Sequence, residues 1–368
     1  MSKRNSYNEI GPETSAQSEL DFGKLESFVG RVVGDFGSAM GITLAYIGDK
    51  LGLYKAMAQA GPVSSEELAK LTGTSERYIR EWLINQAAGG YIEYDTAAGK
   101  YNISPENAIA LTDEESPFFV SGGFQVLTSM LKAEERITES FKTGKGMLWG
   151  EHHHGLFEGT ERFFKPGYNT NLVQSWLPAM EGVIEKLTRG ALVADIGCGH
   201  GASTAIMARA FPNSHFYGYD NHGPSIEKAR KLAEEMDLSD NAKFDVFGAD
   251  NYPGNAYDLV CYFDCLHDMG EPIRSMAHTA KALDKDGTVM IVEPMAGRKV
   301  EENFNPVGRV YSGASVMCCT PNAIASGSIA LGTVASDDAL MDVAKSGGFK
   351  KFRRATETPF NRVFEAKL

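Results

Sequence analysis

Hydrophobic and polar positions follow two different periods in the two halves of the chain. Between residues 28 and 60 the apolar side chains recur three and four positions apart: Val29, Val32, Val33, Phe36, Met40, Leu44, Ile47, Leu51, Tyr54 and Met57. This spacing places them along one side of helices. From residue 188 onward, short apolar runs alternate with amphipathic stretches, which is typical of strands that alternate with helices. We therefore predict a helical N-terminal part and an α/β C-terminal part.

A winged-helix pattern lies within the first part, which we place at residues 28–112. A short helix after Ser64 or Ser65, a turn at residues 73–74 and a second helix over 75–88 precede a hairpin of residues 91–94 and 100–103. Between residues 64 and 100 four Lys or Arg stand against six Asp or Glu. A wing that reads DNA needs a basic recognition helix. We interpret this region as a dimerisation domain and expect no nucleic-acid partner, with a DNA-binding regulator as the alternative.

Residues 113–187 show no strand pattern and are expected to form a helical connector and lid. The three histidines at 152–154 cannot all face one point of a helix, so we expect a loop that either is solvated or reaches a substrate or metal, with His154 as the candidate. Aromatic residues further on could cover a bound ligand or pack in the core. They are Phe163, Tyr168 and Trp176.

The remaining region, residues 188–368, alternates strands and helices. Strand-like runs occupy residues 192–196, 216–220, 243–247, 257–264, 287–293, 349–356 and 361–367. Helical patterns lie between most of them, which predicts a mainly parallel sheet covered on both faces. In such α/β folds ligands bind at the carboxyl ends of the strands.

One glycine-rich turn stands at the first of these strand ends. Residues 195–201 read Asp-Ile-Gly-Cys-Gly-His-Gly, so Gly197, Gly199 and Gly201 lie between a strand and a helix. Glycines let the backbone approach a ligand closely, and the helix start offers free N–H groups. The next strand ends in Asp220, where nucleotide-binding folds place a carboxylate on ribose hydroxyls. A dinucleotide site is the alternative, although Asp195 before the glycines and the spacing of the glycines fit it less well.

These residues, together with Tyr-Gly-Tyr-Asp at 217–220, resemble the first two motifs of class I S-adenosylmethionine-dependent methyltransferases. The resemblance implies a Rossmann-like domain of seven strands with the last one antiparallel, and S-adenosyl-L-methionine as cofactor. It also implies a place for each cofactor-binding residue. Asp195 and the three glycines would face the methionine part, Asp220 and Asn221 the ribose, Asp250 and Asn251 the adenine, and Phe263 and Asp264 would border the cofactor.

The chemistry is expected in the stretch Phe-Asp-Cys-Leu-His-Asp-Met at residues 263–269. Methyl transfer to a hydroxyl needs alignment and a base that removes a proton. His267 suits that task, and Glu293 at the next strand end could fix its tautomer. His267, Asp268 and Glu293 resemble the catalytic positions of plant-type small-molecule O-methyltransferases, which also carry a winged helix, except that Met269 stands where a Trp usually follows. Tyr311, within the insertion 298–331, is expected to line the acceptor pocket.

Metal binding is a rival use of the same residues. His267 and Asp268, with a histidine from 152–154, could hold an iron that chelates an α-keto acid for C-methylation. No clear third ligand stands at the expected place, because Cys318 and Cys319 occupy the region after the fifth strand. We therefore predict no metal.

Composition narrows the remaining choices. The 368 residues can form two domains, and the net charge of −12 argues against neutralising a nucleic-acid backbone. We find no apolar run of membrane-spanning length and no leader sequence, and the five cysteines form no metal-site pattern. We expect a cytoplasmic enzyme that is a homodimer by analogy, with a frayed N-terminus over residues 1–27.

Overall fold

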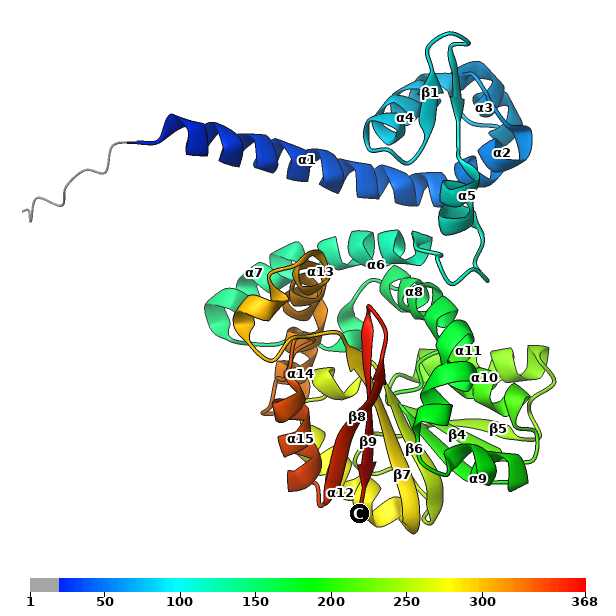
Figure 1. The fold of residues 1–368 in the computed structure, drawn as a ribbon, viewed down its shortest axis with the longest axis vertical. Helices are drawn as coiled ribbons and strands as arrows, with labels where there is room; N and C mark the ends of the chain where they lie inside the picture. The colour runs from blue at the N-terminus through cyan, green and yellow to red at the C-terminus, as the bar shows by residue number, and fades with distance from the viewer. Residues whose placement is uncertain (1–19) are drawn as a thin grey trace, which may run out of the picture.

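The computed structural model describes residues 20–368, which form a helical N-terminal part and an α/β part (Figure 1). The first helix, α1 (Phe22–Lys50), begins after Asp21, whose side chain accepts a hydrogen bond from the Lys24 amide. Because this cap satisfies a free N–H group of the helix start, residues 22–27 are helical, and the expectation that fraying reaches residue 27 is wrong. Residues 1–19 lie outside the described part.

The winged helix has the elements that the sequence predicts. They are α2 (Leu53–Ala60), α3 (Ser65–Thr72), α4 (Glu76–Ala88), β1 (Glu93–Asp95) and β2 (Lys100–Asn102). Ser64 and Glu67 form a capping box at the start of α3. The Trp82 indole N–H on α4 donates to the Leu44 carbonyl at 2.8 Å, and Gly48 of α1 lies directly against the same ring. The C-terminal half of α1 is therefore packed tightly onto this domain.

A run of helices connects the two parts and contains no strand, as predicted. Its helices are α5 (Pro105–Thr112), α6 (Ser121–Leu131), α7 (Glu134–Thr143), α8 (Gly155–Asn171) and α9 (Val183–Arg189), with a π-helical turn at Leu172–Trp176. Arg162 on α8 pairs with Asp49 of α1 at 2.8 Å and with Glu114 at 2.9 Å. These ion pairs fasten α8 to the N-terminal part.

A seven-stranded sheet forms the centre of the C-terminal part (Figure 1). Its strands are β3 (Leu192–Ile196), β4 (His215–Asp220), β5 (Ala242–Val246), β6 (Tyr257–Phe263), β7 (Leu283–Pro294), β8 (Lys351–Glu357) and β9 (Asn361–Lys367). Their order is β5-β4-β3-β6-β7-β9-β8, and the last strand, β9, runs antiparallel to both neighbours. The predicted fold class is confirmed.

Helices cover both faces of this sheet because successive strand residues point to opposite sides. Val193 packs with α9, α10 (Ala202–Ala210) and α11 (Gly223–Glu235), whereas Ala194 packs with α12 (Pro272–Ala282) and α15 (Asp337–Ser346). The insertion after β7 forms α13 (Pro306–Ala314), a π-helical turn at Ser315–Cys319 and α14 (Thr320–Ser326). Within residues 20–368 no helix combines the length and apolarity that crossing a membrane requires.

The topology fixes where a ligand can bind. β3 pairs with β4 on one side and with β6 on the other, so the strand order reverses at β3. The helices that follow these strands leave in opposite directions and open a crevice at the carboxyl ends. The glycine-rich turn and the Phe263–Met269 stretch both begin at this crevice.

Candidate active site

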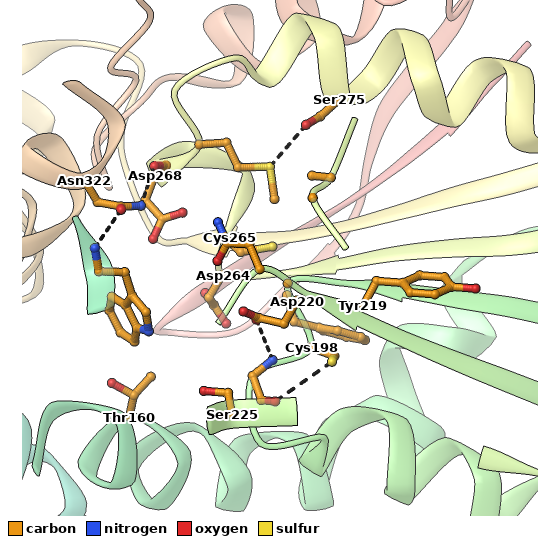
Figure 2. A pocket seen from close by; sticks show the side chains of 18 of the residues that line it. Thr160, Cys198, Tyr219, Asp220, Ser225, Asp264, Cys265, Asp268, Ser275 and Asn322 are labelled. Carbon is orange, nitrogen blue, oxygen red and sulfur yellow. Dashed lines mark hydrogen bonds between the residues drawn. The ribbon is translucent and has the colours of Figure 1, made fainter. Parts of the chain in front are cut away.

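A cavity of about 390 Å³ lies at the carboxyl ends of β3, β4 and β6 and is covered by α8. Figure 2 shows Asp220 and Cys198 on one side, Asp268 and Ser275 on the opposite side, and Asp264 and Cys265 between them. Several of the predicted cofactor-binding residues line it: Gly197, Gly199, Asp220, Asn221, Asp250, Phe263 and Asp264. Its volume lies in the range of small-molecule sites.

The glycine-rich turn needs glycine for its conformation. Gly197, Gly199 and Gly201 have φ values of 72°, 52° and 81°, which side chains with a Cβ rarely adopt. The Asp220 carboxylate accepts the Gly199 N–H at 3.0 Å, and burial raises the pKa of Asp220. The turn is therefore tied to the end of β4.

Asp195 supports the turn from behind and does not line the cavity. Its buried carboxylate accepts the hydroxyls of Ser203 at 2.7 Å and Thr204 at 2.6 Å, both in the first turn of α10. Burial raises the pKa of Asp195 to about 6. Asp195 thus ties the end of β3 to the first turn of α10.

The far end of the cavity lies beyond β4 and β5. Asp250 lines it and forms an ion pair with Arg274 at 2.8 Å, while Tyr219 and Phe247 add aromatic surface. Asn251 is turned away: its side-chain oxygen accepts the Gly248 N–H at 2.9 Å and closes the local turn.

Asp264 holds an unusual conformation at the end of β6. It has a φ of 51°, a region that non-glycine residues seldom occupy and that often marks functional sites. Its carboxylate accepts the Tyr168 hydroxyl at 3.1 Å and the Asn361 amide at 2.8 Å. Burial raises the pKa of Asp264 to about 7 and does the same for Asp268, which also lines the cavity.

His267 and Glu293 form a buried pair at the ends of β6 and β7. The imidazole Nδ1 lies 2.6 Å from a Glu293 carboxylate oxygen, and the other oxygen accepts the His267 backbone N–H at 3.2 Å. Burial alone would lower the pKa of His267, but the Glu293 carboxylate and the Cys319 side chain outweigh it and hold this pKa well above its usual value. Nδ1 is engaged by Glu293, and the Cys319 side chain also hydrogen-bonds to the imidazole, so Nε2 has this thiol as its neighbour. His267 is buried and does not line the cavity, whereas Asp268 next to it does.

The predicted lid residues occupy different environments. Tyr168 lines the cavity, and so does Phe164, whereas its neighbour Phe163 packs outside it. Trp176 is fully buried in the core beneath α8, and Tyr311 is buried with its hydroxyl donating to the Phe360 carbonyl at 2.9 Å.

The three consecutive histidines divide between surface and interior. His154 is exposed and stacks on His153. His152 is buried, and neither of its ring nitrogens has a hydrogen-bond partner among the described residues. His154, the histidine predicted to reach a substrate, therefore lies at the surface, and the buried one is His152, two residues earlier.

Several residues that line the cavity were not predicted from the sequence. Glu161 and Thr160 of α8 and His200 of the glycine turn line the cavity, as do Trp149 and Arg274. The potential ligand atoms of His267, Asp268 and Cys319 lie within 4.8 Å of one another. Among residues 20–368, these three residues form the cluster that could hold a metal ion. Only His200 carried a signal, since it lies inside the glycine motif.

The family comparisons divide the chain in the same way. Residues 187–346 match a methyltransferase domain, and residues 38–113 match the Rv2258c-like winged HTH domain. The chain is an S-adenosylmethionine-dependent methyltransferase. Its winged helix and its Rossmann-like domain are both recognised, so the fold and cofactor implied by the sequence resemblance are confirmed.

Similar proteins share this two-part layout. Mitomycin biosynthesis 6-O-methyltransferase of Streptomyces lavendulae is 25% identical over 252 residues, which cover 64% of this methyltransferase and 69% of that protein. The structure of the mitomycin 7-O-methyltransferase MmcR superposes with a TM-score of 0.70 and 17% identity, covering 95% of this chain and 100% of that one. Human N-acetylserotonin methyltransferase in complex with SAM gives 0.70 and 15%, with 95% and 99% covered.

Proposed function

We propose that this methyltransferase transfers the methyl group to a hydroxyl oxygen of a small molecule, with His267 as general base. The observation that carries the proposal is the buried His267–Glu293 pair, 2.6 Å apart, at the strand ends that border the cavity. Glu293 keeps the proton on Nδ1, so that Nε2 can accept one. S-adenosylmethionine, when bound, would supply the methyl group on a sulfonium leaving group, and the proton of the acceptor hydroxyl would pass to Nε2 of His267. The Glu293 carboxylate stabilises the resulting imidazolium.

The cofactor residues divide along the cavity. We assign the methionine end to the glycine turn, the ribose hydroxyls to Asp220 with Asn221, and the adenine to Asp250 and the aromatic wall. We place the sulfonium next to the carboxyl groups of Asp264 and Asp268, which, when ionised, would stabilise its positive charge. The positions of these residues around one cavity support the assignment.

An aromatic hydroxyl is the acceptor that the surroundings favour. Next to Cys319 lies an apolar cluster of Met130, Leu156 and Cys318, with Trp149 and Phe157 packed against it. Similar proteins are named for, or bind, cyclic molecules: mitomycin for MmcR, N-acetylserotonin for the human enzyme, and 2-hydroxy-5-methyl naphthoic acid for NcsB1. Flat ring systems of this kind would fit between such side chains.

The test is S-adenosylhomocysteine formation with a panel of hydroxylated aromatic acceptors. N-acetylserotonin and hydroxynaphthoic acids would be tried first. With an accepted substrate, His267→Ala should lower kcat by about 10²- to 10⁴-fold and leave the Kd for S-adenosylmethionine within twofold. A variant that keeps its wild-type kcat would refute the base assignment.

Metal-assisted methylation of an α-keto acid is the second candidate, favoured by one observation. Nitrogen, oxygen and sulfur ligand atoms of His267, Asp268 and Cys319 lie within 4.8 Å of one another, so Cys319 supplies the third ligand for which the sequence suggested a histidine. Imidazole, carboxylate and thiolate suit zinc or iron. Metal analysis of the purified protein decides: stoichiometric metal that Cys319→Ala removes supports this candidate, and full activity in metal-free protein rules it out.

We also propose that α1 joins two copies of the chain. Its first turns project beyond the rest of the molecule (Figure 1), while Asp35 pairs with Arg309 of α13 at 3.0 Å, and α1 exposes a stripe of large apolar residues: Leu25, Phe28, Val29, Val33, Phe36 and Met40. A monomer rarely exposes such a stripe, and an amphipathic helix suits a symmetric partner. Replacing Val33 and Phe36 with Ser should give monomers in sedimentation analysis, whereas Phe118→Ser, which changes an exposed residue elsewhere, should leave the dimer intact.

The winged helix supports assembly better than DNA binding. On α4, Arg77 pairs with Glu81 and Arg80 with Glu76, so both arginines of this helix face acids of their own helix. DNA phosphates would have to compete with these pairs. We further propose a cytoplasmic location, which is consistent with five free cysteines.

A further inference from the structure

One polar pair joins the lid helix to the glycine turn across the cavity. His200, between Gly199 and Gly201, places its Nδ1 2.7 Å from a carboxylate oxygen of Glu161 on α8. Both residues line the cavity, and their side chains are 6% and 29% exposed. The pair thus closes the cavity at the turn where β3 meets α10.

The acids nearest the glycine turn are already engaged or lie out of reach of a ligand, which leaves Glu161 as the available carboxylate. S-adenosylmethionine ends in an α-ammonium and an α-carboxylate, which require an acceptor and donors respectively. Asp220 already accepts two backbone N–H groups, and Asp195 lies behind the turn. Glu161 faces the turn from the opposite wall with His200 as its hydrogen-bond partner, and His200 keeps its Nε2 as a second donor position.

We propose that Glu161 and His200 read the amino-acid end of the cofactor. Glu161 accepts hydrogen bonds from the α-ammonium and from Nδ1–H of His200, and the Nε2–H of the same ring donates to the α-carboxylate, which requires His200 in its imidazolium form because only that form donates from both nitrogens. Their mutual bond at the same time fastens α8 over this end. The inference rests on the proposed placement of the methionine part at the glycine turn, and it adds two specificity-determining residues, one inside the motif and one on α8.

Calorimetric titration with two ligands separates recognition from simple support of the helix. S-adenosylhomocysteine carries the amino-acid end, and 5′-methylthioadenosine lacks it. Glu161→Gln should weaken binding of S-adenosylhomocysteine about 10- to 100-fold, the loss expected for a charged hydrogen bond, and leave 5′-methylthioadenosine within twofold. His200→Gln should behave in the same direction.

Glu158→Gln is the matched control, because Glu158 lies one turn earlier on α8, pairs with Lys228 at 3.1 Å and does not line the cavity. It should leave the binding of both ligands within twofold. Equal weakening of both ligands in Glu161→Gln would show that the pair only positions α8, and unchanged binding of S-adenosylhomocysteine would also overturn the proposal. Failure of the wild-type protein to bind either ligand would instead refute the cofactor placement on which the inference rests.

Discussion

Replacing Glu293 by Gln tests the proposed base without touching the imidazole. The buried carboxylate accepts from Nδ1 of His267 at 2.6 Å and from the backbone N–H at 3.2 Å. The Gln amide has nearly the same shape but no charge, and its NH₂ group can donate to Nδ1. That bond favours the tautomer with the proton on Nε2, which cannot accept another from the acceptor hydroxyl.

Glu293→Gln should change both kcat and the pKa of His267. Loss of correct tautomer and charge in a hydrogen-bonded base pair costs about 10²- to 10⁴-fold in kcat. Glu293 also raises the pKa of His267 against the effect of burial, so its removal should lower that pKa. Since the base acts when unprotonated, activity rises as pH increases through the His267 pKa, and in Glu293→Gln this rise should occur at lower pH.

The assay combines the pH dependence of kcat with an NMR titration of ¹⁵N-labelled histidine, which needs no acceptor. Glu293→Asp is the matched variant: it restores the charge, so the rise should return toward its wild-type pH even if the shorter side chain keeps kcat low. An Nδ1 and Nε2 titration that is the same in wild type and Glu293→Gln, together with kcat within twofold, would contradict the assigned pair.

Three further predictions concern the cofactor and the fold. Burial raises the pKa values of Asp264 and Asp268 to about 7, so both are protonated below that pH and carboxylates above it. Only S-adenosylmethionine carries a sulfonium, so its affinity relative to that of S-adenosylhomocysteine should rise about tenfold between pH 6 and 8. Calorimetry measures both affinities. A constant ratio would refute this. Tyr168→Phe removes a hydrogen bond that lowers the Asp264 pKa, so the same rise should move to higher pH; an unmoved midpoint argues against the contact. Gly48→Ala would place a Cβ 2.5 Å from the Trp82 ring and should reduce the free energy of unfolding by about 1–3 kcal/mol, measured by urea denaturation; a wild-type midpoint would disprove the tight packing of α1.

The strand ends could be predicted from the sequence because their signals are local. A buried run that ends in glycines or an acid specifies both a strand and the residue at its carboxyl end, and Asp220, Asp264 and Asp268, which follow such runs, all line one cavity. The His267–Glu293 contact also follows from topology, because parallel neighbours β6 and β7 bring their ends together.

The lid could not be predicted in the same way. An α8 residue faces the cavity or the core according to the rotation of the helix, and adjacent aromatics such as Phe163 and Phe164 have equal hydrophobicity but different surroundings. The π-helical turn that ends in Cys319 has no sequence signature, yet it brings this thiol to His267. Trp176 is aromatic like the cavity-lining residues of α8, but its side chain is fully buried in the hydrophobic core.

The contrast between residues at strand ends and residues of the lid explains why the sequence specifies the cofactor more sharply than the acceptor. Residues assigned to S-adenosylmethionine follow strands whose register is fixed by the sheet, so a short motif is enough to define them. The apolar cluster beside Cys319 is assembled from α6, α8 and the turn after α13, which are held together by side-chain packing and side-chain hydrogen bonds rather than by a strand ladder. Such contacts can change with single substitutions while the sheet stays the same. Acceptor identity should therefore respond to changes at Met130, Leu156 and Cys318, and cofactor affinity should not.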